Sequence, residues 1–146
     1  MPLVFLDESN FNYKFAVWRR VESISFFLEN MNLNQEETDQ IYGLPVNRVL
    51  EWLSTRYVLN LILGTNKKNV FLKDQFGKPY VFNSDTFVSL SHCDKMVAVA
   101  VSDFPVGIDI EKVNDKAFRI KDKFASDSDL LIKGAEEDAF YFSKLW

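Results

Sequence analysis

The sequence is poor in the features that mark secreted and membrane proteins. Its one cysteine, Cys93, excludes an intramolecular disulfide, so we expect a reducing, cytoplasmic setting. No segment approaches the ~20 consecutive apolar residues that a membrane-spanning helix needs. The start of the chain also lacks the basic segment of a secretory signal. Glycine and proline, with five and four residues, are too sparse to mark a domain boundary.

Basic residues are in the minority as well. The formal net charge of -4 argues against a general nucleic-acid binder, which usually carries a basic excess. By contrast, 47% of the residues are hydrophobic and 15% are aromatic, which is ample material for a packed core. A chain of 146 residues with this composition is expected to fold as a domain rather than to be disordered.

Local patterns predict most of the secondary structure. We expect strands at 3–6, 13–18, 69–73, 80–82 and 96–101, and two short helices, one over 23–30 and one capped by Asn34. The strongest helix is predicted over 48–63, with Gly64 as its stop. Its apolar face is expected to consist of Val49, Leu50, Leu53, Tyr57 and Leu61.

The stretch from 88 to 111 carries the clearest sign of chemistry. Residues 107–111 alternate apolar and acidic, so a strand there would place Asp109 and Glu111 on one face, with α-carbons roughly 7 Å apart. Two such carboxylates can converge on a hard cation such as Mg²⁺. The alternative is a half-buried strand with a solvated acidic face. A Ser-His pair, Ser91 and His92, precedes this motif across a buried strand, but a hairpin register cannot be fixed from the sequence.

Several basic residues are candidates for binding an anion. Arg48 and Arg56 recur with Trp52 at four-residue steps on the predicted helix, although solvated arginines are the usual meaning of such a pattern. Lys78 lies in a loop between Gly77 and Pro79, where an ordinary turn lysine is the alternative. A lone histidine such as His92 is more often structural than catalytic.

Three motifs in order resemble the 4′-phosphopantetheinyl transferase superfamily, and its larger, two-lobed members most closely. They are Gly77-Lys78-Pro79, then Ser89-Leu90-Ser91-His92, then Val106-Gly107-Ile108-Asp109-Ile110-Glu111-Lys112. The resemblance covers about residues 45–146. It implies an α+β fold with a largely antiparallel sheet packed by the helix over 48–63. Residues 1–104 would form the N-terminal lobe and residues 105–146 the start of the C-terminal lobe.

The resemblance also implies a function and a set of site residues. The family moves the 4′-phosphopantetheine arm of coenzyme A onto a serine of an acyl or peptidyl carrier protein and releases adenosine 3′,5′-bisphosphate. Asp109 and Glu111 would be the catalytic pair that holds Mg²⁺. Coenzyme A would contact Arg48, preferred over Arg56, together with Lys78, Ser91 and His92. A basic face on a predicted helix over 115–124, which includes Lys121 and Lys123, would steer an acidic carrier protein.

The chain departs from the family at its end. The helix predicted over 135–146 reaches Trp146, which matches the first letter of the family pattern W-x-x-K-E-x-x-x-K, and the remaining letters are absent. That pattern supplies a third acidic group, so no residue present is nominated as the general base. Missing strands would leave an open sheet edge and an uncovered apolar face, so we expect either a truncated chain or self-association that restores the site. The alternative function is a non-catalytic coenzyme A or carrier-protein binding fragment, or an inactive remnant.

Overall fold

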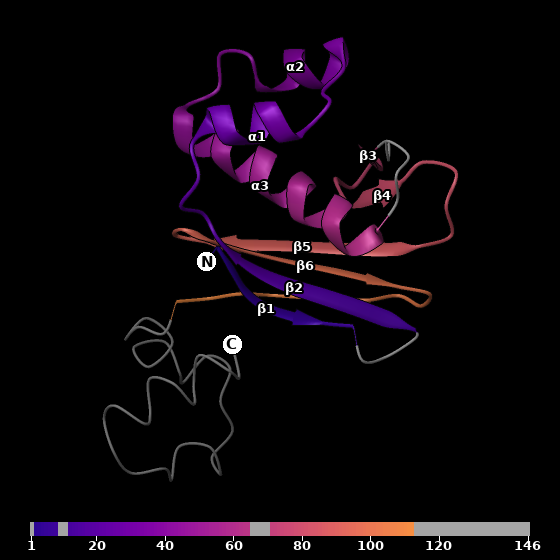
Figure 1. Cartoon of the computed structure of the whole chain (residues 1–146). Helices are drawn as coiled ribbons and strands as arrows, with labels where there is room; N and C mark the ends of the chain where they lie inside the picture. The colour runs from indigo at the N-terminus through magenta and orange to yellow at the C-terminus, as the bar shows by residue number, and fades with distance from the viewer. Residues whose placement is uncertain (1, 9–11, 65–70, 113–146) are drawn as a thin grey trace, which may run out of the picture. The chain divides into compact units, whose positions relative to one another are not determined.

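The computed structural model describes residues 2–8, 12–64 and 71–112. Residues 1–110 form one compact unit, in which three helices cover one face of a six-stranded antiparallel sheet (Figure 1). This arrangement confirms the predicted α+β class with an antiparallel sheet. The boundary between lobes at residue 104 stays a prediction, and the helices expected over 115–124 and 135–146 lie outside the described residues.

The sheet has the order β1-β2-β6-β5-β4-β3. Its strands are β1 (Leu3–Asp7), β2 (Tyr13–Arg19), β3 (Phe71–Lys73), β4 (Pro79–Val81), β5 (Phe87–Cys93) and β6 (Met96–Ser102). β6 lies at the centre, between β2 and β5, and is buried along nearly its whole length. The pairing of β4 with β5 is short, because it places only Tyr80 opposite Phe87.

The helices begin and end as their sequences dictate. Helix α1 (Ile24–Asn30) starts behind Ser23, whose hydroxyl accepts from the Phe26 N–H. Helix α2 (Gln35–Ile41) has a capping box, in which the Asn34 side chain accepts from the Glu37 N–H and Glu37 accepts from the Asn34 N–H. Helix α3 (Val46–Leu63) ends at Gly64, which takes the left-handed conformation at φ 60°. The predicted cap at Asn34 and the predicted stop at Gly64 are confirmed.

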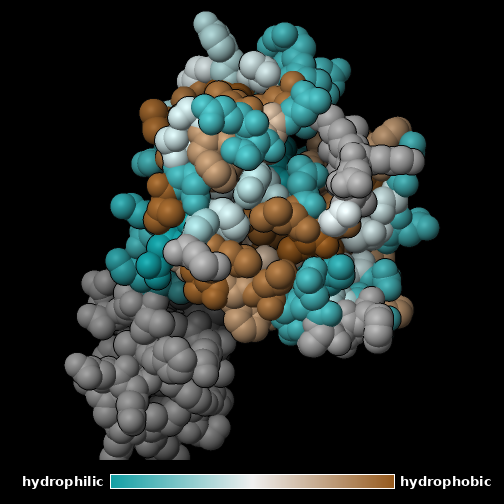
Figure 2. Space-filling model, viewed as in Figure 1, coloured by the Kyte–Doolittle hydropathy of each residue, from teal (hydrophilic) through white to brown (hydrophobic). Residues whose placement is uncertain are grey.

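Two apolar clusters hold the unit together. In the first, α3 packs on the sheet; its buried members are Ala16, Trp18, Val58, Leu59, Ile62, Val81, Val88, Val97, Val99 and Val101. In the second, Phe27, Ile41, Val49 and Leu53 join the three helices. Tyr57 connects the two clusters, because its ring lies edge-on to Trp18 at 5.4 Å and to Phe27 at 5.6 Å. On the face shown in Figure 2, apolar surface gathers across the middle, where α3 lies against the sheet.

The predicted apolar face of α3 is wrong in its second half. Leu61 is 49% exposed, whereas Val58, Leu59 and Ile62 are buried against the sheet. The first half of α3 buries Val49 and Leu53 among the three helices, whereas its second half buries Val58, Leu59 and Ile62 against the sheet, so the buried face of the helix changes along its length. None of the helices in the described part of the chain is long and apolar enough to cross a membrane.

The strand predicted over 107–111 is also wrong, since the structure assigns no strand to these residues. Residues 107–110 are tied instead to side chains of β5. The Ile108 N–H donates to Ser89 Oγ at 3.0 Å, and the Ile110 N–H donates to Ser91 Oγ at 3.1 Å. The predicted alternation itself holds, with Ile108 and Ile110 half-buried and Asp109 and Glu111 exposed. Serine hydroxyls therefore replace the backbone partners that a neighbouring strand would supply.

Candidate functional site

Strand β5 sends its side chains to opposite faces of the sheet, and this separates the predicted site residues into two groups. Val88 pairs with Val101 and His92 with Val97, so the side chain of His92 is on the face that carries α3. Ser89 and Ser91 pair with Ala100 and Ala98 on the other face. Ser91 and His92 thus stand on opposite faces at the end of one strand.

On the face away from α3, Ser91 and Asp109 form a polar pair. Ser91 Oγ donates to Asp109 Oδ1 at 2.6 Å and also accepts from the Ile110 N–H. The small side chains of Ala98, Ala100 and the serines let residues 107–110 approach this face closely, which is why the carboxylate of Asp109 comes within reach of β5. The structure therefore brings Ser91 and Asp109 together.

The donor chemistry of this region fits a hard cation. Asp109 and Glu111 are both exposed, and carboxylate oxygens are the ligands that Mg²⁺ prefers. The described residues contain no group of three or more His, Cys, Asp or Glu side chains placed to hold a metal ion. A cation at these two carboxylates would therefore take its other oxygen ligands from water or from a bound phosphate.

On the α3 face, a cavity of about 490 Å³ lies between α3, the β3–β4 loop and the end of β5. We call it the α3 pocket. It is lined by Leu44, Arg48, Glu51, Trp52, Thr55, Arg56, Lys73, Gly77, Pro79, Leu90 and His92. Four of these residues are basic or, in the case of histidine, able to become cationic, and one is acidic. The pocket thus suits an anion that also has an apolar part.

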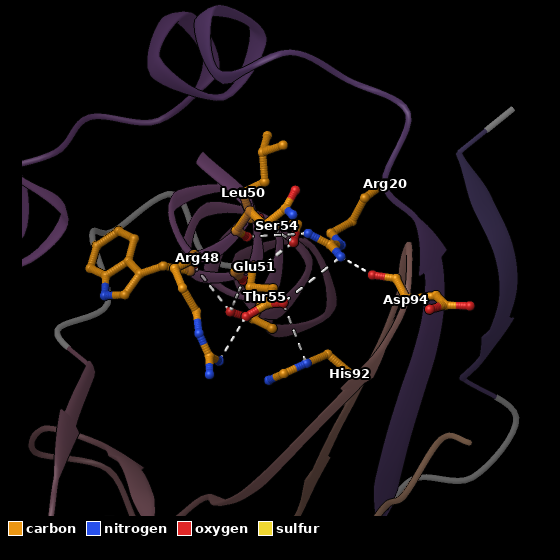
Figure 3. Close-up of polar contacts among 10 residues, drawn as sticks. Arg20, Arg48, Leu50, Glu51, Ser54, Thr55, His92 and Asp94 are labelled. Carbon is orange, nitrogen blue, oxygen red and sulfur yellow. Dashed lines mark hydrogen bonds and ion pairs between the residues drawn. The ribbon is translucent and has the colours of Figure 1, made fainter. Parts of the chain in front are cut away.

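Arg48 and His92, both predicted ligands, meet in the α3 pocket through a shared carboxylate. Arg48 Nη1 donates to Glu51 Oε2 at 3.0 Å, and His92 Nδ1 lies 3.8 Å from Glu51 Oε1 (Figure 3). Arg48 extends from the first turns of α3, and His92 ends the α3-facing row of β5. The fold therefore joins two residues that are 44 positions apart in the chain.

Arg56, which the sequence analysis ranked below Arg48, also lines the α3 pocket. Its guanidinium carbon lies 3.4 Å from the centre of the Trp52 ring, so the two side chains are stacked. Burial lowers the pKa of Arg56 to about 10, against an opposing effect from the negative charge of Glu37. The four-residue spacing of Trp52 and Arg56 was the signal in the sequence that could have found this stack.

Lys78 stands apart from the other predicted ligands. It lines a different cavity, on the far side of the β3–β4 loop, and its ammonium lies 6.0 Å from the centre of the Phe87 ring. Asp74 shapes this loop by accepting from the Phe76 and Lys78 N–H groups at 2.8 and 2.9 Å. Of the described lysines, the one that lines the α3 pocket is Lys73, which was not among the predicted ligands.

Comparison with curated proteins finds relatives whose names share one activity. The chain is 31% identical over 99 residues to the 4′-phosphopantetheinyl transferase gsp of Aneurinibacillus migulanus, which is 66% of this chain and 41% of that protein. It is 40% identical over 81 residues to the 4′-phosphopantetheinyl transferase psf-1 of Bacillus pumilus, or 53% of this chain and 35% of that one.

A third relative, the 4′-phosphopantetheinyl transferase Sfp of Bacillus subtilis (strain 168), is 36% identical over 80 residues. That match covers 52% of this chain and 36% of the relative. The chain therefore spans about two fifths or less of the length of these three relatives. No protein-family model matches it.

Proposed function

This chain belongs to the 4′-phosphopantetheinyl transferase superfamily, and from this premise we propose that it serves the transfer of the 4′-phosphopantetheine arm of coenzyme A to a carrier protein. In this reaction a serine oxygen of an acyl or peptidyl carrier protein forms a bond to phosphorus, and the bond to adenosine 3′,5′-bisphosphate breaks. The relatives that are named for this activity are longer than this chain. The names of the relatives favour a transferase over the alternative of a non-catalytic binding fragment.

The observation that carries the proposal is the composition of the α3 pocket. Coenzyme A is an anion with several phosphate groups and a flat base, and the pocket offers basic side chains from three different elements together with the indole of Trp52. Guanidinium groups match the geometry of phosphate oxygens. We propose that Arg48 and His92 bind phosphate here, with Arg56 and Lys73 as neighbours that raise the local positive potential.

The second group of predicted residues would serve the pyrophosphate. The pairing of β4 with β5 stops at Phe87, and within the described part of the chain no other strand pairs with the end of β5 along that edge. A long ligand can therefore reach His92 on one face and Ser91 on the other. We propose that Asp109 and Glu111 hold Mg²⁺, which would offset the charge that develops on the leaving phosphate. Ser91 keeps the Asp109 carboxylate in place through its hydrogen bond. Lys78 remains a predicted ligand.

Two measurements on the full 146-residue chain test the proposal. Calorimetric titration with adenosine 3′,5′-bisphosphate should show binding, and Arg48→Ala should weaken it about tenfold, as expected for the loss of a charge-assisted hydrogen bond. Incubation with coenzyme A, Mg²⁺ and an apo carrier protein, followed by intact mass spectrometry, reports transfer. Asp109→Asn should abolish any transfer that the wild type shows.

The outcomes separate the candidate functions. Binding accompanied by transfer supports the transferase. Binding without transfer, in a chain whose Asp109→Asn variant behaves as the wild type, favours the alternative of a binding fragment. No binding of the nucleotide by the wild-type chain contradicts the role given to the α3 pocket.

A further inference from the structure

Glu51 is out of place in a pocket for an anion. It is the one acidic residue among the described residues that line the α3 pocket, and its side chain is only 19% exposed. A carboxylate at this position repels phosphate and so weakens phosphate binding, unless a favourable effect offsets the repulsion. The contacts of Glu51 with neighbouring side chains indicate such an effect.

Two arginines and a histidine surround the carboxylate of Glu51 (Figure 3). Arg48 Nη1 donates to Oε2 at 3.0 Å, while Oε1 lies 3.8 Å from His92 Nδ1 and 4.0 Å from Arg20 Nη2. Arg48 and His92 line the α3 pocket and Arg20 does not. Glu51 therefore stands between Arg20 on one side and the pocket residues Arg48 and His92 on the other.

Arg20 is held in place by burial and by hydrogen bonds to the backbone. Its side chain is 7% exposed, and it follows directly after β2. Its guanidinium donates to the backbone carbonyls of Asn47 and Asp94, at the start of α3 and in the turn between β5 and β6. Its buried Nε has no hydrogen-bond partner among the residues that the structure describes. A buried guanidinium needs a nearby negative charge, and this requirement holds the Glu51 carboxylate where it is.

The position of the carboxylate decides which ring nitrogen of His92 faces the pocket. With Nδ1 directed at Glu51, the other nitrogen points away from that carboxylate, as Figure 3 shows. In a neutral imidazole the proton is favoured on the nitrogen that faces a negative charge, here Nδ1. Nε2 can donate to a phosphate only when the ring is doubly protonated, a form that the Glu51 carboxylate and the phosphate both favour. Nearby Arg48 is held on the same side of α3 by its hydrogen bond to Oε2.

We propose that Glu51 is a positioning residue of the α3 pocket: anchored by Arg20, its carboxylate orients His92 and Arg48 for a bound phosphate. This inference rests on the proposed function, because the phosphate is that of coenzyme A. Glu51 touches no substrate in this assignment and acts through the two residues that do.

The proposal and a simple charge argument predict opposite results for one substitution. Glu51→Gln removes a negative charge from the pocket, which by itself should tighten the binding of any anion. Loss of positioning should weaken it. We expect Glu51→Gln to raise the Kd for adenosine 3′,5′-bisphosphate about tenfold, as expected when charge-assisted contacts of two ligands are loosened. Tighter or unchanged binding overturns the proposal.

Two further variants guard against a trivial result. Glu51→Asp keeps a countercharge for Arg20 but withdraws the carboxylate by one methylene, so it cannot reach Arg48 and His92 together. We expect its Kd to rise as well. Glu29→Gln makes the same change of charge at an exposed position on α1 and should bind as the wild type. A Glu51→Asp variant that binds as tightly as the wild type contradicts the positioning role.

A measurement without ligand tests the same contact directly. His92 is the only histidine, so its ring gives one unambiguous set of signals in a long-range ¹H–¹⁵N NMR spectrum. At a pH where the ring is neutral, we expect the proton on Nδ1 in the wild type and a shift toward Nε2 in Glu51→Ala. A wild-type ring protonated on Nε2 overturns the proposal. If the wild type binds no nucleotide, the proposed function fails, and this spectrum alone decides whether Glu51 positions His92.

Discussion

Arg56 shows at the scale of one residue how this chain places charge where it is costly. Its guanidinium is stacked on Trp52, and burial lowers its pKa from the ordinary value of an arginine to about 10. Above pH 10, this side chain therefore binds fewer protons in the folded state than in the unfolded state. The free energy of unfolding gains from this residue as pH rises above about 10, and below pH 10 the full penalty of the buried charge is present.

This penalty leads to a prediction for Arg56→Met, which keeps a long side chain over Trp52 without the charge. The relief of desolvation and the loss of a cation–π contact of about 0.5–2 kcal/mol oppose each other. We therefore expect the free energy of unfolding in urea to change by less than about 1 kcal/mol. Binding of adenosine 3′,5′-bisphosphate should nevertheless weaken about tenfold, because a cation of the α3 pocket is lost.

The matched control is Arg19→Met. Arg19 is exposed on β2 and does not line the α3 pocket, so its substitution should leave the Kd unchanged. If Arg56→Met binds the nucleotide as the wild type does, then Arg56 is a structural arginine whose stack on Trp52 serves packing alone. Equal losses in both variants would instead indicate an effect of net charge.

At the scale of the element, the segment 107–110 depends on two serine side chains rather than on strand pairing. The Ile108 N–H donates to Ser89 and the Ile110 N–H to Ser91. Each such hydrogen bond contributes about 0.5–1.5 kcal/mol, so removing one should raise local opening without unfolding the sheet. We expect Ser89→Ala to speed amide hydrogen exchange at Ile108, and Ser91→Ala to speed it at Ile110.

Because each serine accepts from one particular N–H group, each substitution should affect one amide only. Exchange at the amides of β6 should not change in either variant, because these amides belong to the centre of the sheet. Ser84→Ala, in the loop before β5, serves as the control. Unchanged exchange at Ile108 in Ser89→Ala would mean that some other contact holds the segment, and the placement of Asp109 beside Ser91 would then need another cause.

Elements with a strong local signal could be predicted from the sequence. The capping residues Ser23 and Asn34 and the stop at Gly64 act within one helical turn, so no knowledge of the rest of the fold is needed to recognise them. The second half of α3 was harder, because apolar residues occupy every side of the helix there except the one that carries Arg56 and Asn60. Only the sheet selects Val58 and Ile62 over Leu61.

The strand predicted over 107–111 failed for a related reason. Alternation reports which side chains are buried, and it predicted this correctly for Ile108 and Ile110. It does not report whether backbone groups have a strand beside them. The two serines of β5 that accept these N–H groups are conspicuous in the sequence, but only the three-dimensional arrangement shows that their hydroxyls serve as substitutes for a strand.

The candidate site could be predicted in part. His92 was chosen by motif and Arg48 by its place on the predicted helix together with the resemblance, and the structure places both in one pocket. Glu51 was overlooked because a glutamate on a helix is usually a solvated residue, and nothing in the spacing shows that Arg20, from another element, lies beneath it. Lys73 and Lys78 flank one loop, and the direction in which each side chain leaves the hairpin depends on the strand register.

At the scale of the whole molecule, the charge of the chain and the charge of the α3 pocket have opposite signs. The formal net charge is -4, whereas Arg48, Arg56 and Lys73 outnumber Glu51 in the pocket even when His92 is neutral. Distant charges are screened over about 8–10 Å at physiological ionic strength, so a bound phosphate interacts mainly with the pocket. The net charge should affect the approach of an anionic ligand at low salt more than its final affinity.

A salt titration of the wild-type chain distinguishes attraction by the positive charges of the α3 pocket from repulsion by the negative net charge of the chain. If the pocket dominates, raising NaCl from about 50 to about 500 mM shortens the Debye length from roughly 14 to roughly 4 Å and should raise the Kd for adenosine 3′,5′-bisphosphate severalfold. Repulsion from the whole chain predicts the reverse, because salt would then relieve it. Arg56→Met should have a shallower salt dependence than the wild type, since one of the attracting charges is gone. A slope of the opposite sign, or an equal slope in both proteins, would place the binding of the nucleotide elsewhere on the molecule.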